Sequence, residues 1–513
     1  MLKDRGVAVI FGIPGVHNQE MYRGIEEAGL THILARHEQG AGFMADGYAR
    51  ATGRPGVCYV ITGPGVCNIM TPMGQAYSDS VPMLVLSSCL DNLTLKRGQL
   101  HQMLDQETAA GCVCDWSETA PDAATAYHLI DRALTEFAMS RRRPKHIQVP
   151  IAALETAAPG ADAFRAPAPV SHAPDIAPVA AALAAAKRPL FIFGGGAVAG
   201  WQAARDLTAR AGAASFTTYA GRGIIADHAP LHFGAMLPRP VSADVLGQAD
   251  LVIAFGTMLA EVDLWRDDLG HRCPLVRVDI DAEVLCDRHR PDIALLADAG
   301  PVMAALALGI DRPATGWTRA EVAATRARWR AEIDAERPGI IPVADALRAC
   351  LPPDTMIYSD MTQFAYAAKE IWPMDRPGHW HHPTGFGTLG YALPAAIGGA
   401  VGRPGKPTLA IAGDYGFQYT VQELATAVEL GLPLPIILWD NGKLGEIEDS
   451  MIAAQIAPNA VIQRNPDFGL LAQAYGAGTA APRTLAQMQD AVRAALKADR
   501  PTLIHVRSDI SLG

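Results

Sequence analysis

The fold is decided by residues 411–445, which read IAGDYGFQYTVQELATAVELGLPLPIILWDNGKLG. An apolar run opens this stretch, helical periodicity follows over 421–430, and a second apolar run lies at 436–439. This order predicts a βαβ unit, whose crossover leaves the two strands parallel. Asp414 and Asn441 follow these strands, so we expect them side by side at the carboxyl edge of the sheet.

The residue types at this edge favour a cation and a phosphate group. A carboxylate and an amide offer oxygen ligands to a hard divalent cation, and the helix N-terminus beside them favours anions. The alternative is an ordinary βαβ unit with polar strand ends. Other segments of the chain decide between the two.

Length and composition predict the broad class. With 513 residues the chain exceeds one core, and about three domains are expected. The formal charge of -10 argues against nucleic acid or an anionic membrane as a partner. The N-terminus lacks a signal-peptide pattern, and the sequence has no uncharged apolar run of membrane-spanning length, so a soluble cytoplasmic protein is expected. The eight scattered cysteines are expected to be buried, reduced thiols.

Several motifs together resemble one family. Gly413-Asp414-Tyr415 and Asp440-Asn441 are similar to its GDG and NN pair, with Asn441 27 positions after Asp414; Tyr415 replaces a Gly and Asp440 replaces an Asn. The other matches are HEQGA at 37–41 with GYAR at 47–50, TGPG at 62–65 with Asn68, and a DxGQ-like turn at 360–363. These motifs resemble the thiamine diphosphate (ThDP) superfamily of 2-oxo acid decarboxylases and acetolactate synthases, and the GDYGF wording is similar to 5-guanidino-2-oxopentanoate decarboxylases.

The resemblance implies a fold of three open parallel-sheet α/β domains. The aminopyrimidine-binding domain is expected at 1–158, a degenerate Rossmann-like middle domain at 172–325, and the diphosphate-binding domain at 340–513. An Ala- and Pro-rich stretch at 156–174 and a charged, Pro-containing stretch around 328–342 are interpreted as linkers. The resemblance also implies more helix upstream of Met1.

The resemblance assigns a site residue by residue. Mg²⁺ is expected on Asp414, Asn441 and the main-chain carbonyl of Lys443. Glu38 is the acid expected to hydrogen-bond N1′ of the aminopyrimidine, a task that needs a carboxyl group in a dry pocket; its alternative is a residue that merely stabilises the helix start. The remaining cofactor-binding residues implied are Pro14, Gly15, Thr62, Asn68, Gln363, Gly387, Thr388, Leu389, Gly413, Tyr415, Gly416, Leu444 and Gly445.

On the substrate side, the resemblance adds Asp105, Gln106 and Glu446 as catalytic candidates. Asp105 either places negative charge near the substrate or caps the next helix. Glu446 and Asp449 share a helix face, which either is a solvated acidic face or recognises a cationic substrate tail. Weaker candidates for proton transfer are His17 and His101, and the pair His381 and His382 is interpreted as structural or substrate-lining.

The middle domain carries a weak nucleotide signal. Gly194 to Ala199 resembles a G-x-G-x-x-A dinucleotide turn, but an acid about 20 residues onward is missing. Acetolactate synthases hold FAD in this domain and usually carry an Arg after the strand that matches residues 254–256. Residues 257–263 are acidic and contain no Arg, which makes FAD unlikely.

The expected activity is non-oxidative decarboxylation of a 2-oxo acid, with a possible guanidino side chain, to an aldehyde. One alternative is an acetolactate synthase-type carboligase, which joins the enamine to a second 2-oxo acid or aldehyde. Two others are a cofactor-binding protein without turnover and a nicotinamide oxidoreductase. The resemblance implies a homodimer or homotetramer, with the cofactor between Glu38 of one subunit and Asp414 of another.

Overall fold

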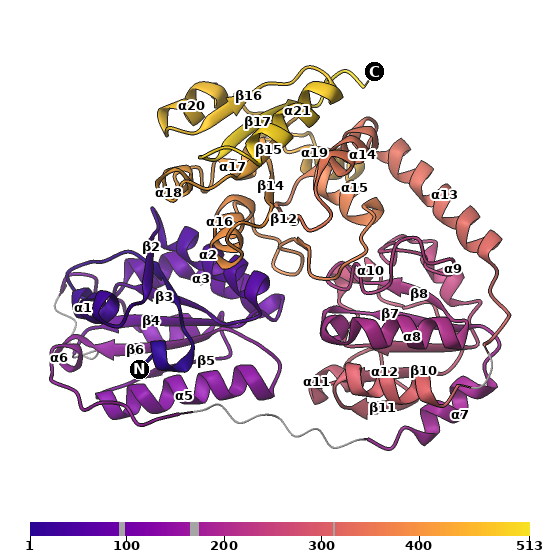
Figure 1. Ribbon diagram of the computed structural model, residues 1–513, viewed down its shortest axis with the longest axis horizontal. Coiled ribbons are helices and arrows are strands. Elements are labelled where there is room, and N and C mark those ends of the chain that lie inside the picture. The colour runs from indigo at the N-terminus through magenta and orange to yellow at the C-terminus, as the bar shows by residue number, and fades with distance from the viewer. Residues whose placement is uncertain (92–97, 165–173, 311–312, 513) are drawn as a thin grey trace. The chain divides into compact units, whose positions relative to one another are not determined.

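The computed structural model describes residues 1–91, 98–164, 174–310 and 313–512. These residues form three sheets in which the strands other than the short β13 pair in parallel, and helices flank each sheet (Figure 1). The predicted fold class, three open parallel-sheet α/β domains, is therefore confirmed.

The N-terminal sheet has the strand order β2-β1-β3-β4-β6-β5. The chain leaves β1 toward one side of this sheet and returns to β3 on the other, so a switch point lies between β1 and β3. In open parallel sheets ligands bind at the carboxyl ends of the strands beside such a point. The strands are β1 (Val9–Gly12), β2 (Thr31–Leu34), β3 (Gly56–Val60), β4 (Met83–Cys89), β5 (Trp116–Thr119) and β6 (Lys145–Pro150).

Alternation along the central strands buries both faces of this sheet. Phe11, Cys58 and Val85 belong to one core cluster, whereas the residues just before them in sequence belong to another. Helices α2 and α3 cover one face and α5 covers the other (Figure 1). The helices of this domain are η1 (Lys3–Arg5), α1 (Gln19–Glu27), α2 (Glu38–Thr52), α3 (Pro64–Ser78), α4 (Gln106–Gly111), α5 (Ala123–Met139) and α6 (Ile151–Leu154).

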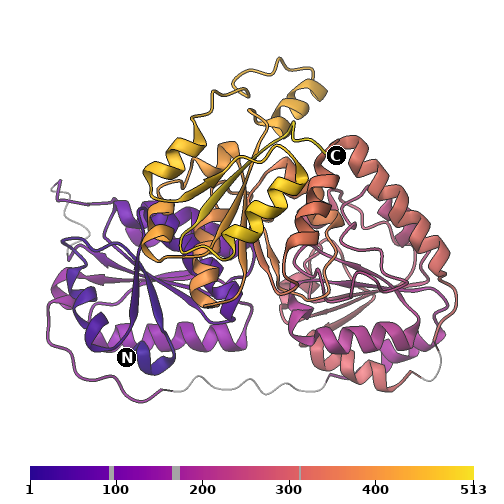
Figure 2. The same cartoon turned by 45° about the horizontal axis from the view of Figure 1, so that its top comes forward.

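The C-terminal sheet contains the predicted βαβ unit. Strand β14 pairs in parallel with β15, with Gly413 opposite Trp439, so Asp414 and Asp440 leave the sheet together. Figure 2 shows its strands side by side. Five of its six strands are, in order across the sheet, β12 (Met356–Ser359), β14 (Thr408–Gly413), β15 (Pro435–Asp440), β17 (Thr502–Arg507) and β16 (Gly478–Ala480). The helices are α16 (Ala392–Gly402), α17 (Asp414–Phe417), α18 (Glu423–Glu429), α19 (Gly445–Ala453), α20 (Phe468–Ala474) and α21 (Leu485–Ala495).

The N-terminal and C-terminal sheets belong to one compact unit, made of residues 1–169, 350–363 and 385–513. Within it α2 packs directly on α16, because glycines let the two backbones approach: an added Cβ on Gly47 would lie 1.9 Å from the Ala395 carbonyl oxygen. The Tyr391 hydroxyl donates to buried Asp46 at 2.7 Å across this contact.

A second compact unit contains residues 170–349 and 364–384. Its five-stranded sheet has the order β11-β10-β9-β7-β8. The elements are α7 (Ala177–Ala185), β7 (Pro189–Phe193), η2 (Gly195–Gly200), α8 (Trp201–Ala211), β8 (Ala214–Thr217), α9 (Ser242–Leu246), β9 (Leu251–Phe255), α10 (Glu261–Leu264), β10 (Leu275–Asp279), α11 (Ala282–Leu285), β11 (Ile293–Leu296), α12 (Ala299–Leu308), α13 (Arg319–Glu336), α14 (Ile340–Cys350), α15 (Gln363–Ile371) and β13 (Trp380–His381).

The linker expected around 328–342 is wrong. Most of this stretch lies in α13, and α14 begins at Ile340. Thr318 and Glu321 form a capping box at the start of α13, and buried Trp329 and Ile333 anchor its apolar side. The charges that suggested a linker occupy the solvated side of this amphipathic helix.

Three of the eight cysteines, Cys67, Cys112 and Cys286, are exposed free thiols rather than buried ones, which corrects that expectation. Among the described residues, none of the helices combines the length and the apolar character that a membrane crossing requires.

Candidate active site

Glu38 opens α2 at the carboxyl edge of the N-terminal sheet. Its side chain is 8% exposed, and Asn68 of α3 donates to its Oε2 at 2.9 Å. A Cβ added at Gly65 would lie 3.5 Å from Oε1, so the turn that opens α3 lies beside this carboxyl group. The structure thus brings two of the predicted site residues, Glu38 and Asn68, into contact.

A second carboxyl group supports the loop that carries Glu38. Glu423 of α18 is fully buried and accepts from the backbone N–H groups of Arg36 and His37, both at 3.0 Å. The absence of a side chain at Gly40 makes room for it, since a Cβ there would lie 2.2 Å from Glu423 Oε1. Burial raises the pKa of Glu423 to about 7.

The turns after β1 and β3 meet at the switch point between these two strands. An added Cβ on Gly15 would lie 2.3 Å from Ile61 Cδ1, so the turn of exposed Pro14 and half-buried Gly15 lies against the end of β3. Thr62 is buried, and its hydroxyl donates to Ser88 at 2.8 Å. The predicted residues Pro14, Gly15 and Thr62 therefore line the same edge.

Gln106 and Asp105 have defined structural contacts. The Gln106 carbonyl accepts from Gly63 N at 2.8 Å, and its amide donates to the Gln148 side chain at 2.8 Å, so it fixes the turn after β3. Asp105 caps α4 by accepting from Thr108 N at 3.0 Å. This bond lowers the pKa of Asp105. A helix cap was one of the two roles predicted for this residue. Roles for either residue toward a substrate stay predictions.

His17 and His101 lie edge to face, with ring centroids 4.9 Å apart. Loss of hydration, and then the neighbouring ring, lower the pKa of His17. His101 has a φ of 62°, and its carbonyl oxygen would lie 2.3 Å from a Cβ on Gly63. The strained loop of His101 therefore packs on the turn that opens α3.

At the C-terminal sheet, Asp414 opens α17 and is 3% exposed. Tyr415, at the position where the family usually has Gly, lies in the right-handed helical turn of α17, which a side chain tolerates. Its ring packs edge to face on Tyr419, with centroids 5.6 Å apart. The predicted turn therefore forms without glycine at that position.

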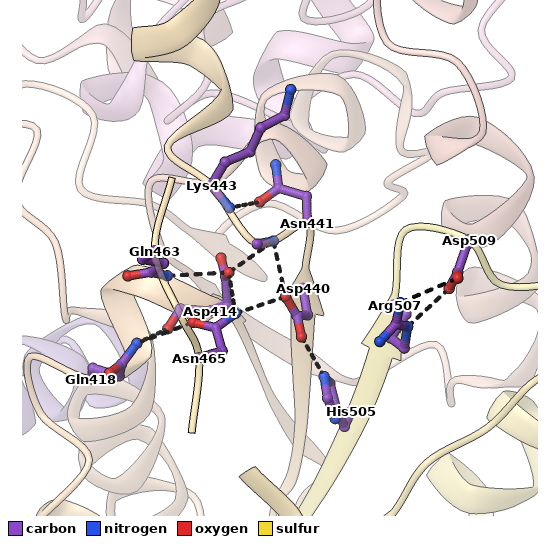
Figure 3. A network of polar contacts seen from close by, with 11 residues as sticks. Asp414, Gln418, Asp440, Asn441, Lys443, Gln463, Asn465, His505, Arg507 and Asp509 are labelled. Atoms are coloured by element: carbon purple, nitrogen blue, oxygen red, sulfur yellow. Dashed lines mark hydrogen bonds and ion pairs between the residues drawn. The ribbon is translucent and has the colours of Figure 1, made fainter. Parts of the chain in front are cut away.

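Asp414 and Asp440 lie in one polar network (Figure 3). The amide of Asn465 donates to Asp414 Oδ2 at 2.7 Å and to Asp440 Oδ1 at 2.9 Å. Burial raises the pKa of Asp414, and the Asp440 charge adds to that shift. His505 contacts Asp440 Oδ2 at 2.7 Å, and this hydrogen bond lowers the pKa of Asp440.

The predicted magnesium ligands fit the cation chemically. A carboxylate (Asp414), an amide oxygen (Asn441) and a main-chain carbonyl (Lys443) are the oxygen donors that Mg²⁺ prefers. Gly442 N donates to Asp414 Oδ2 at 3.1 Å, which brings the loop after β15 against Asp414. Asn441 donates to Gln363 at 2.9 Å, so the predicted phosphate ligand Gln363 also lies here.

The loop before α16 lies against the Asp414 turn. A Cβ on Gly416 would lie 3.5 Å from Leu389 Cδ2 and 2.8 Å from Asp360 Oδ2. Asp360 is buried and accepts from Gly390 N at 2.8 Å, and burial raises its pKa to about 7. Gly387 has a φ of 69° and is exposed, and half-buried Thr388 separates it from Leu389. The proposed roles of these residues toward the cofactor stay predictions.

Helix α19 starts directly after the loop of Lys443. Leu444 N donates to Val461 O at 2.8 Å, and Gly445 is buried against Gln363, whose side-chain carbon would lie 2.7 Å from an added Cβ. Gln363 also donates to Asp449 at 3.4 Å. One side chain thus connects the magnesium loop to the acidic face of α19.

The sequence alone did not single out several residues of this site. Asp360 belongs to the DxGQ-like motif, but its hydrogen bond to the turn before α16 was not predicted. Glu423 belongs to the predicted βαβ unit, and the only sequence feature that could have indicated it is an acidic residue within an otherwise apolar helix pattern. The others missed are Gln463, Asn465 and His505.

The glycine turn of the middle domain packs on a second turn. Gly196 N donates to Gly256 O at 3.0 Å, and a Cβ on Gly194 would lie 2.3 Å from the same oxygen. The turn leads into the short 3₁₀ helix η2. His381 and His382 are buried, and His382 packs edge to face on Tyr366. Within the described residues, no cluster of three or more metal-ligating side chains includes them.

Comparison with known proteins agrees with this geometry. Three domains of thiamine pyrophosphate (TPP, a synonym of ThDP) enzymes match the chain: the N-terminal TPP binding domain at residues 1–109, the central domain at 176–306 and the C-terminal TPP binding domain at 360–506. The chain is 43% identical to the probable 2-ketoarginine decarboxylase AruI of Pseudomonas aeruginosa, over 99% of this chain and 92% of the relative. This chain belongs to the thiamine pyrophosphate enzymes.

More distant members of the thiamine pyrophosphate enzymes include acetolactate synthases. Isozyme 1 large subunit of Escherichia coli is 30% identical over 99% of this chain and 92% of its own length. The acetolactate synthase of Mycobacterium bovis is 30% identical over 93% of this chain and 81% of its own length. The two TPP binding domains contain Glu38 and Asp414 respectively, and these domain matches support thiamine diphosphate as the cofactor.

Proposed function

We propose that the protein is a ThDP- and Mg²⁺-dependent decarboxylase of a 2-oxo acid that carries a cationic guanidino side chain. The observation that supports it most is the full-length similarity to the probable 2-ketoarginine decarboxylase, together with an acidic helix next to the predicted magnesium loop. The reaction consumes one proton: the bond to the carboxylate carbon breaks, carbon dioxide leaves, and the former keto carbon becomes an aldehyde. When bound, ThDP supplies the electron sink for this cleavage.

Glu38 would exchange a proton with the aminopyrimidine ring of bound ThDP. Because Asn68 occupies its Oε2, Oε1 remains to contact N1′ of the aminopyrimidine. The low exposure of Glu38 strengthens this hydrogen bond, since water competes little for it. Pro14, Gly15 and Thr62 line the same edge and would position the aminopyrimidine ring against Glu38.

The diphosphate end is held at the other sheet. Asp414, Asn441 and the Lys443 carbonyl would hold Mg²⁺, and Gln363 orients Asn441. Leu389 lies at Gly416, from where it would contact the bound cofactor. Fixing both ends in this way reduces the orientational freedom that the reaction must otherwise lose.

Helix α19 supplies the recognition of the cationic tail. Glu446 and Asp449 are three residues apart and so share a face, and Gln363 connects Asp449 to the magnesium loop. A guanidinium group pairs in plane with carboxylates through two parallel hydrogen bonds. A solvated acidic face is the alternative role for these residues.

Product identification tests the reaction. Purified protein with ThDP and Mg²⁺ is offered 5-guanidino-2-oxopentanoate, 4-methyl-2-oxopentanoate and pyruvate, and products are followed by mass spectrometry and carbon dioxide release. We expect the guanidino acid to yield its aldehyde with a kcat/KM at least about tenfold above the aliphatic acids. Absence of 2-oxo acid consumption would contradict an enzymatic role and favour a binding protein without turnover.

A carboligase is the second candidate, because acetolactate synthases cover nearly the whole chain at 30% identity. In that reaction the carbon freed of carbon dioxide joins a second carbonyl compound instead of taking a proton. Pyruvate alone separates the two activities. Acetolactate as the main product would favour the carboligase, and acetaldehyde the decarboxylase.

The proposal includes a homodimer or homotetramer with active sites between subunits. Large apolar side chains are exposed beside both halves of the predicted site. Val16, next to Gly15, and Leu104, next to Asp105, are 62% and 81% exposed, and Ile447, next to Glu446, and Ile462, next to Gln463, are 53% and 75% exposed. A second copy that covers both groups would remove this surface from water. Action on a small metabolite favours a cytoplasmic location, which is part of the proposal.

A further inference from the structure

A short segment after α19 braces the predicted magnesium loop. Residues 461–465 run antiparallel to residues 442–444: Lys443 and Ile462 form a bridge, Leu444 N donates to Val461 O at 2.8 Å, and Gln463 N donates to Gly442 O at 3.4 Å. The main-chain position of Lys443, whose carbonyl is expected on the cation, is therefore set by this pairing.

The same segment places two amide side chains on Asp414. Gln463 donates to Asp414 Oδ2 at 3.2 Å, and Asn465 donates to the same oxygen at 2.7 Å (Figure 3). Gly442 N is the third donor to Oδ2, at 3.1 Å. With Oδ2 satisfied in this way, Oδ1 is the oxygen that can face a cation.

Asn465 differs from Gln463 because it bridges two acids. Its one amide nitrogen donates to Asp414 Oδ2 and, at 2.9 Å, to Asp440 Oδ1. Two carboxylates side by side repel each other in a partly buried site. His505 contacts the far oxygen of Asp440 at 2.7 Å, which holds this second acid in place.

We propose that Asn465 is a positioning residue for the Mg²⁺-diphosphate site: its amide ties Asp414 to Asp440, and so holds Asp414 in the rotamer that presents Oδ1 to the cation. The inference rests on the proposed function, since it assumes Mg²⁺ and ThDP at this loop. Residues that hydrogen-bond a metal ligand fix its orientation, and their loss typically costs about 10- to 100-fold in metal affinity.

Titration calorimetry on the apo protein measures this directly. Mg²⁺ is titrated at saturating ThDP, and ThDP at saturating Mg²⁺, for wild type, Asn465→Ala, Asn465→Asp and Gln463→Ala. We expect Asn465→Ala to weaken Mg²⁺ binding about 10- to 100-fold. Asn465→Asp, which keeps the shape and removes the donor, should lose at least as much. Gln463→Ala should lose less, because it removes no bridge. Asn459→Ala, which alters an exposed amide two residues before this segment, is the matched control.

A double-mutant cycle with Asp440 separates bridging from a general effect on folding. Asp440→Asn removes the repulsion between the two acids, so the penalty of Asn465→Ala should shrink at least about threefold in that background. At saturating Mg²⁺, kcat of Asn465→Ala should recover to within about threefold of wild type, because only the binding step is impaired.

Each outcome has one meaning. Equal Mg²⁺ affinity of wild type and Asn465→Ala overturns the inference while leaving the proposed function intact. Failure of the wild type to bind Mg²⁺ and ThDP overturns the proposed function itself. A penalty of the same size in the wild-type and Asp440→Asn backgrounds overturns the bridging role, and so does a loss of thermal stability of the apo variant that accounts for the whole effect.

Discussion

Glu38 is the residue on which the proposed chemistry depends. Replacement by Gln keeps the shape of the side chain and the contact with Asn68, but removes the acid. We expect Glu38→Gln to slow exchange of the C2 proton of bound ThDP by about 10²- to 10⁴-fold, measured by quenched-flow deuterium exchange and NMR. Glu20→Gln, which alters a half-buried acid paired with Arg23, is the control. Near-normal exchange in Glu38→Gln would remove this residue from catalysis.

Single residues also show how far sequence reasoning reaches. The change from Asn to Asp at position 440 is visible in the motif, and so is the charge that it adds. Its compensation is not visible, because His505 follows 65 positions later and Asn465 25 positions later, and only the parallel pairing of β15 with β17 brings His505 alongside. Partners that meet through sheet register carry no local sequence signal.

At the scale of elements, periodicity predicted the βαβ unit of residues 411–445 correctly, since β14 and β15 pair in parallel. The linker at 328–342 was wrong, because charge and proline were read without the capping box that starts α13. The predicted domain boundaries stay a prediction, and so do the roles of the site residues toward cofactor and substrate.

The acidic face of α19 should decide substrate preference. Glu446→Gln and Asp449→Asn each remove a negative charge beside the proposed tail site. Because a guanidinium gains more from a carboxylate than an alkyl chain does, kcat/KM should fall about tenfold for the guanidino acid and by less than about twofold for 4-methyl-2-oxopentanoate. Steady-state kinetics on both acids is the measurement, with Asp490→Asn of α21 as control. Equal losses on both acids would show a solvated face instead.

The contact between α18 and the start of α2 should make stability depend on pH. The pKa of Glu423 is raised from 4.5 to about 7, so the folded state keeps a proton that the unfolded chain has lost between these pH values. Its contribution is therefore fully present below about pH 4.5 and is lost as the pH rises through about 7.

Glu423→Gln removes this titration and keeps an acceptor for the N–H groups of Arg36 and His37. The free energy of unfolding, measured in urea from pH 5 to 8, should fall with pH less steeply in the variant than in wild type. Between pH 5 and 8, wild type should lose roughly 2 kcal/mol more of its free energy of unfolding than the variant does. Glu429→Gln, an exposed acid of the same helix, should follow wild type. Parallel curves for wild type and Glu423→Gln would show that the buried carboxyl group does not titrate there.

At the scale of the whole molecule, contacts within one chain join the two sheets that carry the site, while apolar residues beside the site remain exposed. Glu423 and the contact between α2 and α16 join the N-terminal and C-terminal sheets of one chain, and the apolar residues Val16, Leu104, Ile447 and Ile462 stay exposed. Those residues remain for a second copy to cover. The proposed dimer therefore pairs Glu38 of one subunit with Asp414 of its partner.

Complementation between inactive subunits tests this arrangement. Glu38→Gln and Asp414→Ala each disable one half of every site, so either protein alone should be nearly inactive. In a mixed dimer one site receives both changes and the other receives neither. Random mixing gives half mixed dimers with one intact site each, so co-expression should restore about a quarter of the wild-type activity.

The two variants carry different affinity tags, and tandem purification isolates the mixed dimers, whose activity should approach about half of wild type. Mixing the two proteins after separate purification, under conditions that prevent subunit exchange, is the control and should restore nothing. If each site were instead built within one subunit, every chain of the mixed dimer would carry one defect, and the tandem-purified protein would be as inactive as its parents. Activity in the tandem-purified fraction therefore shows that one subunit supplies the acid and the other supplies the magnesium loop.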